Sequence, residues 1–314
     1  MLALDVICSL GHSATTDELF RRGINLGQIR AGIAGDVIKR AARGSYICLH
    51  SDADQRVAAA THAQIACVSA LRRAKVWSGL GFDLHLWRTP HSHPLKPNRI
   101  QADTGRPNAA FAESHPLADG VGKGVHVHWS RLRFDDFGPS WLASPMNAVW
   151  QAIHCLDEEN AIACLESAVH LDYLSLDQVR EICRSAPSRL QRGIQEMEFT
   201  SDSGLETLVR RRLRHAGHTV VAQVHVNGLG DEDLVVDDCV ALETDGAKWH
   251  GADRFQADRD RDLIVEGLGR RTLRLTHKHV MFEWETTLAT IERVVADAQR
   301  ARWHPVNPLR DSPT

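Results

Sequence analysis

Two short apolar runs joined by an acidic turn place carboxylates near the end of a predicted hairpin. EDLVV (232–236) and VALETD (240–245) are separated by three residues, 237–239. If those three residues form the turn, Asp233 lies opposite Glu243. Directly opposed side chains on paired strands are about 5 Å apart, and like charges at that distance destabilise a sheet. A chain that folds into this hairpin must therefore offset the repulsion.

A divalent cation between the two carboxylates removes this conflict. Oxygen ligands at such a spacing suit Mg²⁺ or Mn²⁺. Asp245 lies two residues after Glu243, leaves the strand on the same face and adds a third carboxylate. His250 follows Gly246 closely enough to donate or take a proton near neutral pH. The alternative is a polar sheet rim that binds no ion.

The composition is that of a globular protein. The chain has 314 residues, enough for two or three domains, and a formal net charge of −3. No apolar run approaches the roughly 18 residues of a membrane span. The seven cysteines are odd in number and no two have C-x-x-C spacing. This disfavours a disulfide framework and a zinc site, and we expect a cytoplasmic protein without a membrane partner.

The N-terminal quarter is the only basic part of the chain. Residues 1–80 hold ten Lys and Arg against six Asp and Glu. Helices are expected at 15–23 and 25–34, followed by a hairpin within 36–49. This order is typical of a winged helix-turn-helix, with DNA as the partner. The candidate DNA contacts are Arg30, Lys39, Arg40 and Arg43. A charged hairpin is also a common way to protect a sheet edge.

The stretch DELFRRGINLGQIRAGIAGDVIKRAARGSYIC resembles the N-terminal domain of the abortive-infection (AbiEi-like) antitoxin family. The resemblance covers about fifty residues. It implies a winged helix, which in that family is often a DNA-binding repressor.

The middle of the chain predicts strands at 80–90 and 124–131. His85, His126 and His128 can share one sheet face at period two. A metal site is conceivable there. We favour polar-face histidines on an antiparallel sheet, because no cysteine or carboxylate spacing supports a metal. Helices are expected at 145–156, 159–168 and 176–184, and the strands-then-helices order resembles the second domain of AbiEi-like proteins.

The C-terminal third predicts an α-β-β-β-α-β-α order. Its expected elements are a helix at 203–216, a strand at 219–226, the hairpin strands 232–236 and 240–245, a helix at 255–266, a strand at 271–276 and a helix at 284–300.

This order resembles the PD-(D/E)xK nuclease superfamily, and more narrowly the family related to very short patch repair endonucleases. The matching residues are Glu206, Asp233, the E-T-D-G-x-x-W-H segment with Glu243, Thr244, Asp245 and His250, and Arg261-Asp262. The resemblance spans roughly 198–295. It implies a metal held by Asp233 and the backbone carbonyl of Thr244, with His250 assisting the chemistry.

The sequence departs from the broader superfamily because Asp245 stands where the E-x-K lysine is expected. Protonation steps then fall to His250 or to a metal-bound water. The alternative is a domain that binds DNA or metal without cutting DNA. Glu206 also fits a capping box with Ser203. Asp258, Arg261 and Asp262 share a helical face, as supporting residues or as plain ion pairs. For Arg210, Arg211, Arg212 and Arg214 we favour a solvated face over a phosphate-binding strip.

The combined prediction is an α/β chain (α+β overall) with Mg²⁺ or Mn²⁺ as cofactor. The expected domains are a winged helix at 1–78, a middle α+β domain at 79–196, a restriction-endonuclease-like domain at 197–303 and a flexible tail at 304–314. The predicted function is metal-dependent endonucleolytic cleavage of DNA. The catalytic set is Glu206, Asp233, Glu243, Asp245 and His250, and Lys248 joins the DNA-binding residues. The rival prediction is a non-enzymatic DNA-binding regulator or antitoxin.

Overall fold

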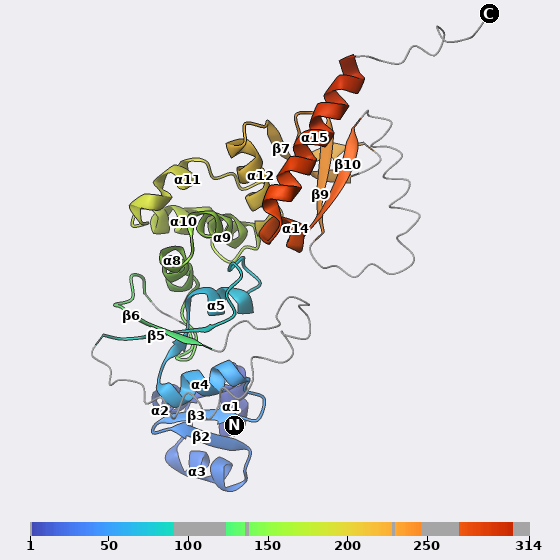
Figure 1. The fold of residues 1–314 in the computed structure, drawn as a ribbon. Coiled ribbons are helices and arrows are strands. Elements are labelled where there is room, and N and C mark those ends of the chain that lie inside the picture. Colours follow the sequence, from blue (N-terminus) through green and yellow to red (C-terminus); the bar gives the residue numbers. More distant parts are fainter. Residues whose placement is uncertain (1, 91–123, 136–137, 228–229, 246–269, 304–314) are drawn as a thin grey trace, which may run out of the picture. The chain divides into compact units, whose positions relative to one another are not determined.

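The computed structural model describes residues 2–90, 124–135, 138–227, 230–245 and 270–303. The chain forms two compact units, Met1–Gln195 and Glu196–Thr314. Helices and strands are mixed in both units, so the chain is α/β overall (Figure 1). None of the described helices combines the length and the apolar character that crossing a bilayer requires. The predicted tail at 304–314 lies outside the described residues.

The first unit begins with short helices around a three-stranded sheet. The elements are α1 (Ala3–Ser9), β1 (Ser13–Thr15), α2 (Thr16–Arg21), α3 (Leu26–Ala34), β2 (Ile38–Ala42) and β3 (Ser45–Cys48). The strand order is β1-β3-β2, with both pairs antiparallel. Helices α2 and α3 each start at a capping box, Thr15 with Glu18 and Asn25 with Gln28. These reciprocal bonds satisfy backbone groups that a helix end leaves open.

The hairpin of β2 and β3 turns at Gly44, whose φ of +76° is readily adopted only by glycine. The apolar sides of this sheet and its helices close over one core cluster. Its most buried members include Ile7, Leu19, Ile29 and Ile38. The helix α1 was not among the predicted elements. It is needed because its Ile7 and neighbouring apolar residues complete this core.

The rest of the first unit combines a second small sheet with a group of helices. The elements are α4 (Ala53–Thr61), β4 (Gln64–Ile65), α5 (Cys67–Arg73), β5 (Leu84–Arg88), β6 (Val125–Trp129), α8 (Pro145–Cys155), α9 (Glu158–His170), α10 (Leu176–Cys183), the 3-10 turn η1 (Ser188–Leu190) and α11 (Gln191–Gln195). The sheet order is β4-β5-β6, and α5 packs against both β5 and α8.

Strands β5 and β6 are parallel, with Leu84 paired to Val125 and Trp87 to His128. The antiparallel pairing expected for them was wrong. Parallel neighbours need a long crossover rather than a tight turn, and residues 89–124 supply that length. Parallel sheets are usually covered on their faces, and every residue of β5 is buried.

The second unit is a four-stranded mixed sheet with helices. The elements are α12 (Gly204–His215), β7 (Val220–Val226), β8 (Gly230–Val236), β9 (Val240–Asp245), β10 (Arg271–Thr276), α14 (His277–Met281) and α15 (Trp284–Trp303). The sheet order is β10-β9-β8-β7. The pairs β7–β8 and β8–β9 are antiparallel, and β9–β10 is parallel.

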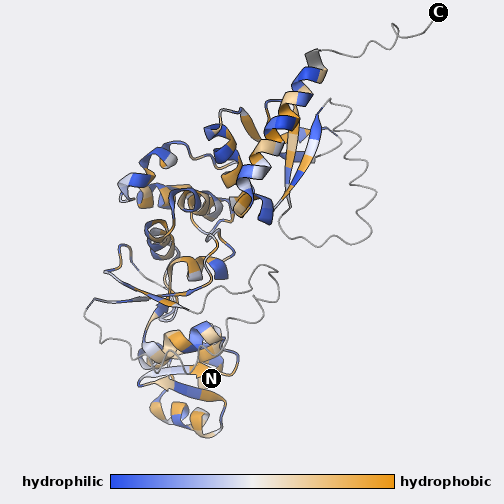
Figure 2. Cartoon of the chain, viewed as in Figure 1, coloured by the Kyte–Doolittle hydropathy of each residue, from blue (hydrophilic) through white to orange (hydrophobic). Residues whose placement is uncertain are grey.

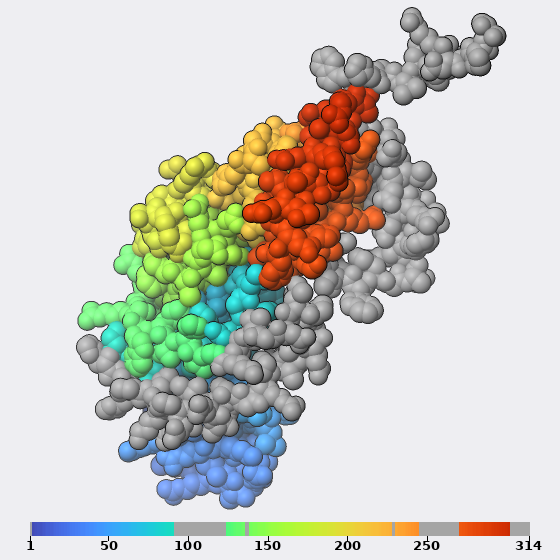
Figure 3. Space-filling view, viewed as in Figure 1, coloured from blue at the N-terminus to red at the C-terminus, as the bar shows by residue number. Residues whose placement is uncertain are grey.

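Helix α12 packs against β7 and β8, and α15 packs against β9 and β10. Hydrophobic and hydrophilic residues alternate along α15 (Figure 2), which buries Ile291, Val295 and Ala298. Its other side forms a continuous ridge on the surface of this unit (Figure 3). The hairpin pairs Val236 with Val240, the register that a three-residue turn at 237–239 predicts. The predicted helix at 255–266 lies outside the described residues.

Candidate active site

Glu206 is a buried carboxylate at the start of α12. Ser203 caps this helix by accepting the N–H of Glu206 at 3.2 Å. The predicted reciprocal bond of the capping box is replaced, because the Glu206 carboxylate accepts the N–H of Asp202 at 2.9 Å. It also accepts the side-chain amide of Gln223 at 3.0 Å. Burial raises the pKa of Glu206, and the nearby negative charge of Asp233 adds to that rise.

Asp233, on β8, holds the neighbouring strand. Its Oδ2 accepts the backbone N–H of Thr244 at 2.8 Å and lies 3.3 Å from the Thr244 hydroxyl. Asp233 and Glu206 thus bring two carboxylates from a strand and a helix into electrostatic contact. Both residues were named in the sequence analysis only as matches to the family that the chain resembles.

Gln223 lies at the same place and was missed by the sequence analysis. The ladder pairs Ala222 with Leu234 and Val224 with Glu232, so the register puts Gln223 opposite Asp233. Gln223 has a φ of +52°, in the left-handed region that residues other than glycine rarely adopt. Strained backbone of this kind gathers at functional sites. No sequence pattern marks it, because glutamine carries no preference for this conformation.

Glu243 has a protein partner, which corrects part of the sequence argument. On β9 it pairs in register with Arg274 of β10, and Arg274 Nε lies 3.0 Å from Glu243 Oε2. Asp233 meanwhile accepts the Thr244 N–H. The inference that a metal ion must offset the repulsion between Asp233 and Glu243 was therefore incomplete. The guanidinium of Arg274 on the adjacent parallel strand and the Thr244 N–H offset part of this repulsion.

The remaining predicted residues of the second unit are only partly described. Asp245 is the last residue of β9, and its side chain lies outside the described part. The described His, Cys, Asp and Glu side chains of this unit form no metal-ligand group of three or more. The predicted residues beyond the described range are Lys248, His250, Asp258, Arg261 and Asp262.

Two of the four arginines of α12, Arg210 and Arg211, are buried, so the favoured solvated face was wrong for them, whereas Arg212 and Arg214 are partly exposed. Arg210 has no exposed side-chain surface and Arg211 only 3%. Arg210 donates to Ser201 Oγ at 2.8 Å, and Arg211 lies 3.3 Å from a Glu196 carboxylate oxygen. The segment before the helix supplies these acceptors, including Glu198, which binds Arg214 at 2.6 Å. The sequence, with four arginines among the five residues 210–214, did not reveal this.

The basic residues predicted to bind DNA lie on the surface of the first unit. Arg30 ends up exposed on α3, Lys39 and Arg40 are exposed on β2, and Arg43 is exposed in the hairpin turn. The pairing of β2 with β3 shifts between Arg40 and Ala42, and Arg40 Nε donates to the Ala42 carbonyl at 3.3 Å. The hairpin therefore presents cations to solvent on a defined backbone.

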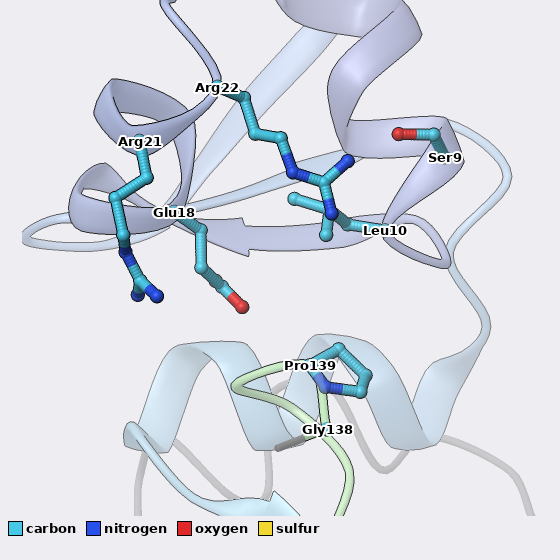
Figure 4. A pocket seen from close by; sticks show the side chains of 7 residues that line it. All are labelled: Ser9, Leu10, Glu18, Arg21, Arg22, Gly138 and Pro139. Atoms are coloured by element: carbon cyan, nitrogen blue, oxygen red, sulfur yellow. The ribbon is translucent and has the colours of Figure 1, made fainter.

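A cavity of about 320 Å³ lies beside α2 in the same unit. The Glu18 carboxylate points into it beside the guanidinium of Arg21, and Pro139 lies across from them (Figure 4). Glu18 is engaged by Ser140, which donates from its N–H at 2.8 Å and from its hydroxyl at 2.6 Å. The cavity is lined by Ser9, Leu10, Glu18, Arg21, Arg22, Gly138 and Pro139.

Two groups of cysteine and histidine side chains in the first unit were also missed. One combines Cys67, His85, His128 and Cys155, and the other Cys8, His12, Cys48 and His50; within each, the ligand atoms all lie within 4.8 Å of one another. The absence of C-x-x-C spacing hid them, because the first group draws one residue from each of four elements. His85 and His128 do lie together on the sheet, as their spacing predicts, but His85 is buried rather than on a solvent-facing polar surface.

The two thiols of the first group, Cys67 and Cys155, have pKa values shifted in opposite directions. Hydrogen bonds from Cys67 and from His85 lower the pKa of Cys155 to about 4. The same contact with Cys155, together with burial, raises the pKa of Cys67. Burial lowers the pKa of His128, and the charge of His85 adds to that effect.

Comparison with protein-family models finds no match to the chain, and comparison with characterised proteins finds no significant sequence relative.

Proposed function

We propose that this protein is a metal-dependent DNA endonuclease that hydrolyses phosphodiester bonds with its second unit. The observation that carries the proposal is the meeting of Glu206 and Asp233 beside the strained Gln223. A buried carboxylate with a raised pKa next to a second carboxylate is typical of a site that binds a cation or moves a proton. The order of helix, three antiparallel strands and a parallel fourth strand agrees with the resemblance to repair endonucleases.

The donor set at this place fits Mg²⁺ or Mn²⁺ in kind, because all its ligand atoms are oxygens. Asp233 and the backbone carbonyl of Thr244 would hold the ion, with Asp245 beside them at the end of β9. When bound, such an ion polarises the scissile phosphate and lowers the pKa of an attacking water. Asp233 also accepts the hydrogen bond of the Thr244 N–H, so it holds the Thr244 backbone, the second proposed metal ligand, next to its own carboxylate. Proton transfer is the proposed role of His250.

The first unit would supply affinity for DNA. Its order of helices and hairpin resembles that of a winged helix, which supports this role, and Arg30, Lys39, Arg40 and Arg43 are exposed there. Contacts from arginine and lysine to phosphate give binding that weakens as salt is added, without sequence preference.

The test is cleavage of duplex, nicked, mismatched and single-stranded DNA by the full chain, with and without Mg²⁺ or Mn²⁺. Asp233→Ala is expected to abolish cleavage. The matched control is Asp231→Ala on the same strand, because Asp231 is exposed and its carboxylate lies 2.7 Å from the ring of the equally exposed His225. We expect Asp231→Ala to cut at the wild-type rate. Cleavage that survives in a folded Asp233→Ala protein, or that ignores divalent metal, contradicts the proposal.

The second candidate is a DNA-binding regulator that keeps the nuclease-like unit as a scaffold. The ion pair of Glu243 with Arg274 favours it, since a carboxylate engaged by arginine is less available to a metal. A regulator binds one DNA sequence tightly without metal and keeps that binding in Asp233→Ala. Binding of this kind, with no cleavage of any DNA form, would support the regulator over the nuclease.

A further inference from the structure

We propose that Cys67, His85, His128 and Cys155 bind a structural zinc ion in the first unit. This site is separate from the carboxylates of the proposed nuclease and does not depend on them. The four residues come from α5, β5, β6 and α8, and their ligand atoms lie within 4.8 Å of one another. Two thiols and two imidazoles are a common structural zinc set.

Two of the distances between ligand atoms lie close to those around a tetrahedral zinc ion. With Zn–S near 2.3 Å and Zn–N near 2.0–2.1 Å, the edges of the tetrahedron are about 3.4 Å between nitrogens and about 3.6 Å between sulfur and nitrogen. His85 Nδ1 lies 3.0 Å from His128 Nε2, and Cys155 Sγ lies 3.8 Å from His85 Nδ1. Shifts of a few tenths of an ångström bring these atoms into zinc geometry.

Charge and burial also suit zinc. Cys67 is fully buried and His85 is 7% exposed, whereas Cys155 lies at the surface. Two thiolates, two neutral imidazoles and one Zn²⁺ sum to zero charge, which removes the cost of burying ionised groups. Four protein ligands leave no open coordination position, so the ion is structural rather than catalytic.

The backbone holds the ligands in place. Cys67 has a φ of +50°, a conformation that costs free energy and that turns its thiol at the start of α5. The preceding Ala66 N–H donates to the His85 carbonyl at 2.9 Å, and the His85 N–H donates to Ser69 Oγ at 2.9 Å. These bonds tie two ligands together across two elements. An ion that binds all four residues would offset the local strain.

His126 lies beside the group without belonging to it. Its ring centroid is 4.8 Å from that of His85, and its Nε2 lies 2.9 Å from an Asp83 carboxylate oxygen. Asp83 therefore engages His126, which is not one of the four residues whose ligand atoms come together. This makes His126→Ala a suitable control, since it removes a neighbouring imidazole and leaves the four ligands.

The other group provides an internal comparison. Cys8 Sγ and Cys48 Sγ are 3.7 Å apart, and Cys48 Sγ lies 3.3 Å from His12 Nδ1. Only Cys48 of that group is buried, and its His50 is exposed. The group of Cys67 has two buried members, so an ion bound there would connect more of the protein interior than one bound by the group of Cys8.

The test measures metal in the full chain purified under reducing conditions. Elemental analysis of the wild type is expected to find zinc, about one equivalent of which is lost in the double variant Cys67→Ser/Cys155→Ser. His126→Ala and Cys8→Ser/Cys48→Ser should keep that equivalent. Titration with Co²⁺ should give the strong visible absorption of tetrahedral coordination, with thiolate charge-transfer bands. If the double variant fails to fold, His128→Cys tests the site instead. It retains four ligands and adds a thiolate, so it should still bind Co²⁺ and its charge-transfer bands should be stronger than those of the wild type.

Several results overturn the proposal. One is a wild-type chain without zinc whose Co²⁺ spectrum is that of the aqueous ion. Another is zinc that is lost only from Cys8→Ser/Cys48→Ser, which assigns the metal to the other group. A third is a Cys67–Cys155 disulfide found by peptide mass mapping in chain that was kept reduced. Chelation supports the proposal if it lowers the melting temperature of the wild type and leaves that of a folded double variant unchanged.

Discussion

The carboxylate of Asp233 accepts the backbone N–H of Thr244 at 2.8 Å, so the residue proposed to bind metal also fastens two strands together. Both roles would be lost in Asp233→Ala. An unsatisfied, partly buried backbone donor costs about 1–3 kcal/mol.

Asparagine separates the two roles, because its side-chain oxygen can still accept the Thr244 N–H but carries no charge. We expect Asp233→Ala to lose about 1–3 kcal/mol of unfolding free energy and Asp233→Asn clearly less. Both variants should lose metal-dependent cleavage. Urea unfolding and a cleavage assay on the same preparations measure the two effects. Equal stability of the two variants would mean that the hydrogen bond contributes nothing.

Arg210 is expected to be a stability residue rather than a DNA contact. Its side chain is fully buried and donates to Ser201 Oγ at 2.8 Å and to the Glu198 carbonyl at 3.3 Å. Arg210→Ala removes a fully buried side chain and leaves the buried Ser201 hydroxyl without its donor, which we expect to cost about 1–3 kcal/mol. The matched control is Arg300→Ala, an exposed arginine of the same unit that pairs with Asp297 and is worth roughly 0–1 kcal/mol. Chemical denaturation distinguishes them, and similar losses in both would contradict the assigned burial role.

The exposed hairpin arginines are expected to act on DNA and not on folding. Replacing Arg40 and Arg43 together with alanine should weaken binding to every sequence and reduce the salt slope by about two phosphate contacts. The control is Arg180→Ala/Arg184→Ala, which removes two exposed arginines of the same unit, one on α10 and one directly after it. Affinity measured across a salt series gives both slopes. An unchanged slope in the hairpin variant would move the DNA surface away from the hairpin.

Local patterns in the sequence identify much of the secondary structure. The period of apolar residues and the capping residue Asn25 indicate helices, and the acidic turn before Val240 predicts the hairpin register. These features depend on residues close together in the chain. The electrostatic contact between Glu206 and Asp233 joins residues 27 positions apart and is seen only in the folded unit.

Features that depend on distant residues were not predictable in this way. The alternation of side chains could not reveal that β5 and β6 are parallel, because parallel and antiparallel strands both have a side-chain period of two. The four side chains from Cys67 to Cys155 meet only in the folded unit. Arg210 looks like any surface arginine until Ser201 is seen to accept its hydrogen bond.

Glu18 links the start of α2 to Ser140, and this contact should make stability depend on pH. Burial alone would raise the pKa of Glu18, but hydrogen bonds from Ser140 and Thr15 outweigh it, so the pKa lies below the ordinary value of 4.5. A carboxyl group whose pKa is lower in the folded state stabilises the protein above its unfolded pKa, and this stabilisation is lost as pH falls through the folded pKa. We therefore expect Glu18→Gln to lose about 1–2 kcal/mol near pH 7.

The difference between Glu18→Gln and wild type should shrink below about pH 4.5, because protonation then removes the charge from the wild-type side chain as well. Asp17→Asn is the matched control, since Asp17 is the exposed neighbour on the same helical turn. Its effect on stability should be small at both pH values. Urea unfolding near pH 7 and near pH 4 gives the two differences directly. A Glu18→Gln penalty that grows as the solution is acidified has the opposite sign, and it would show that the Ser140 hydrogen bonds do not stabilise the ionised carboxylate.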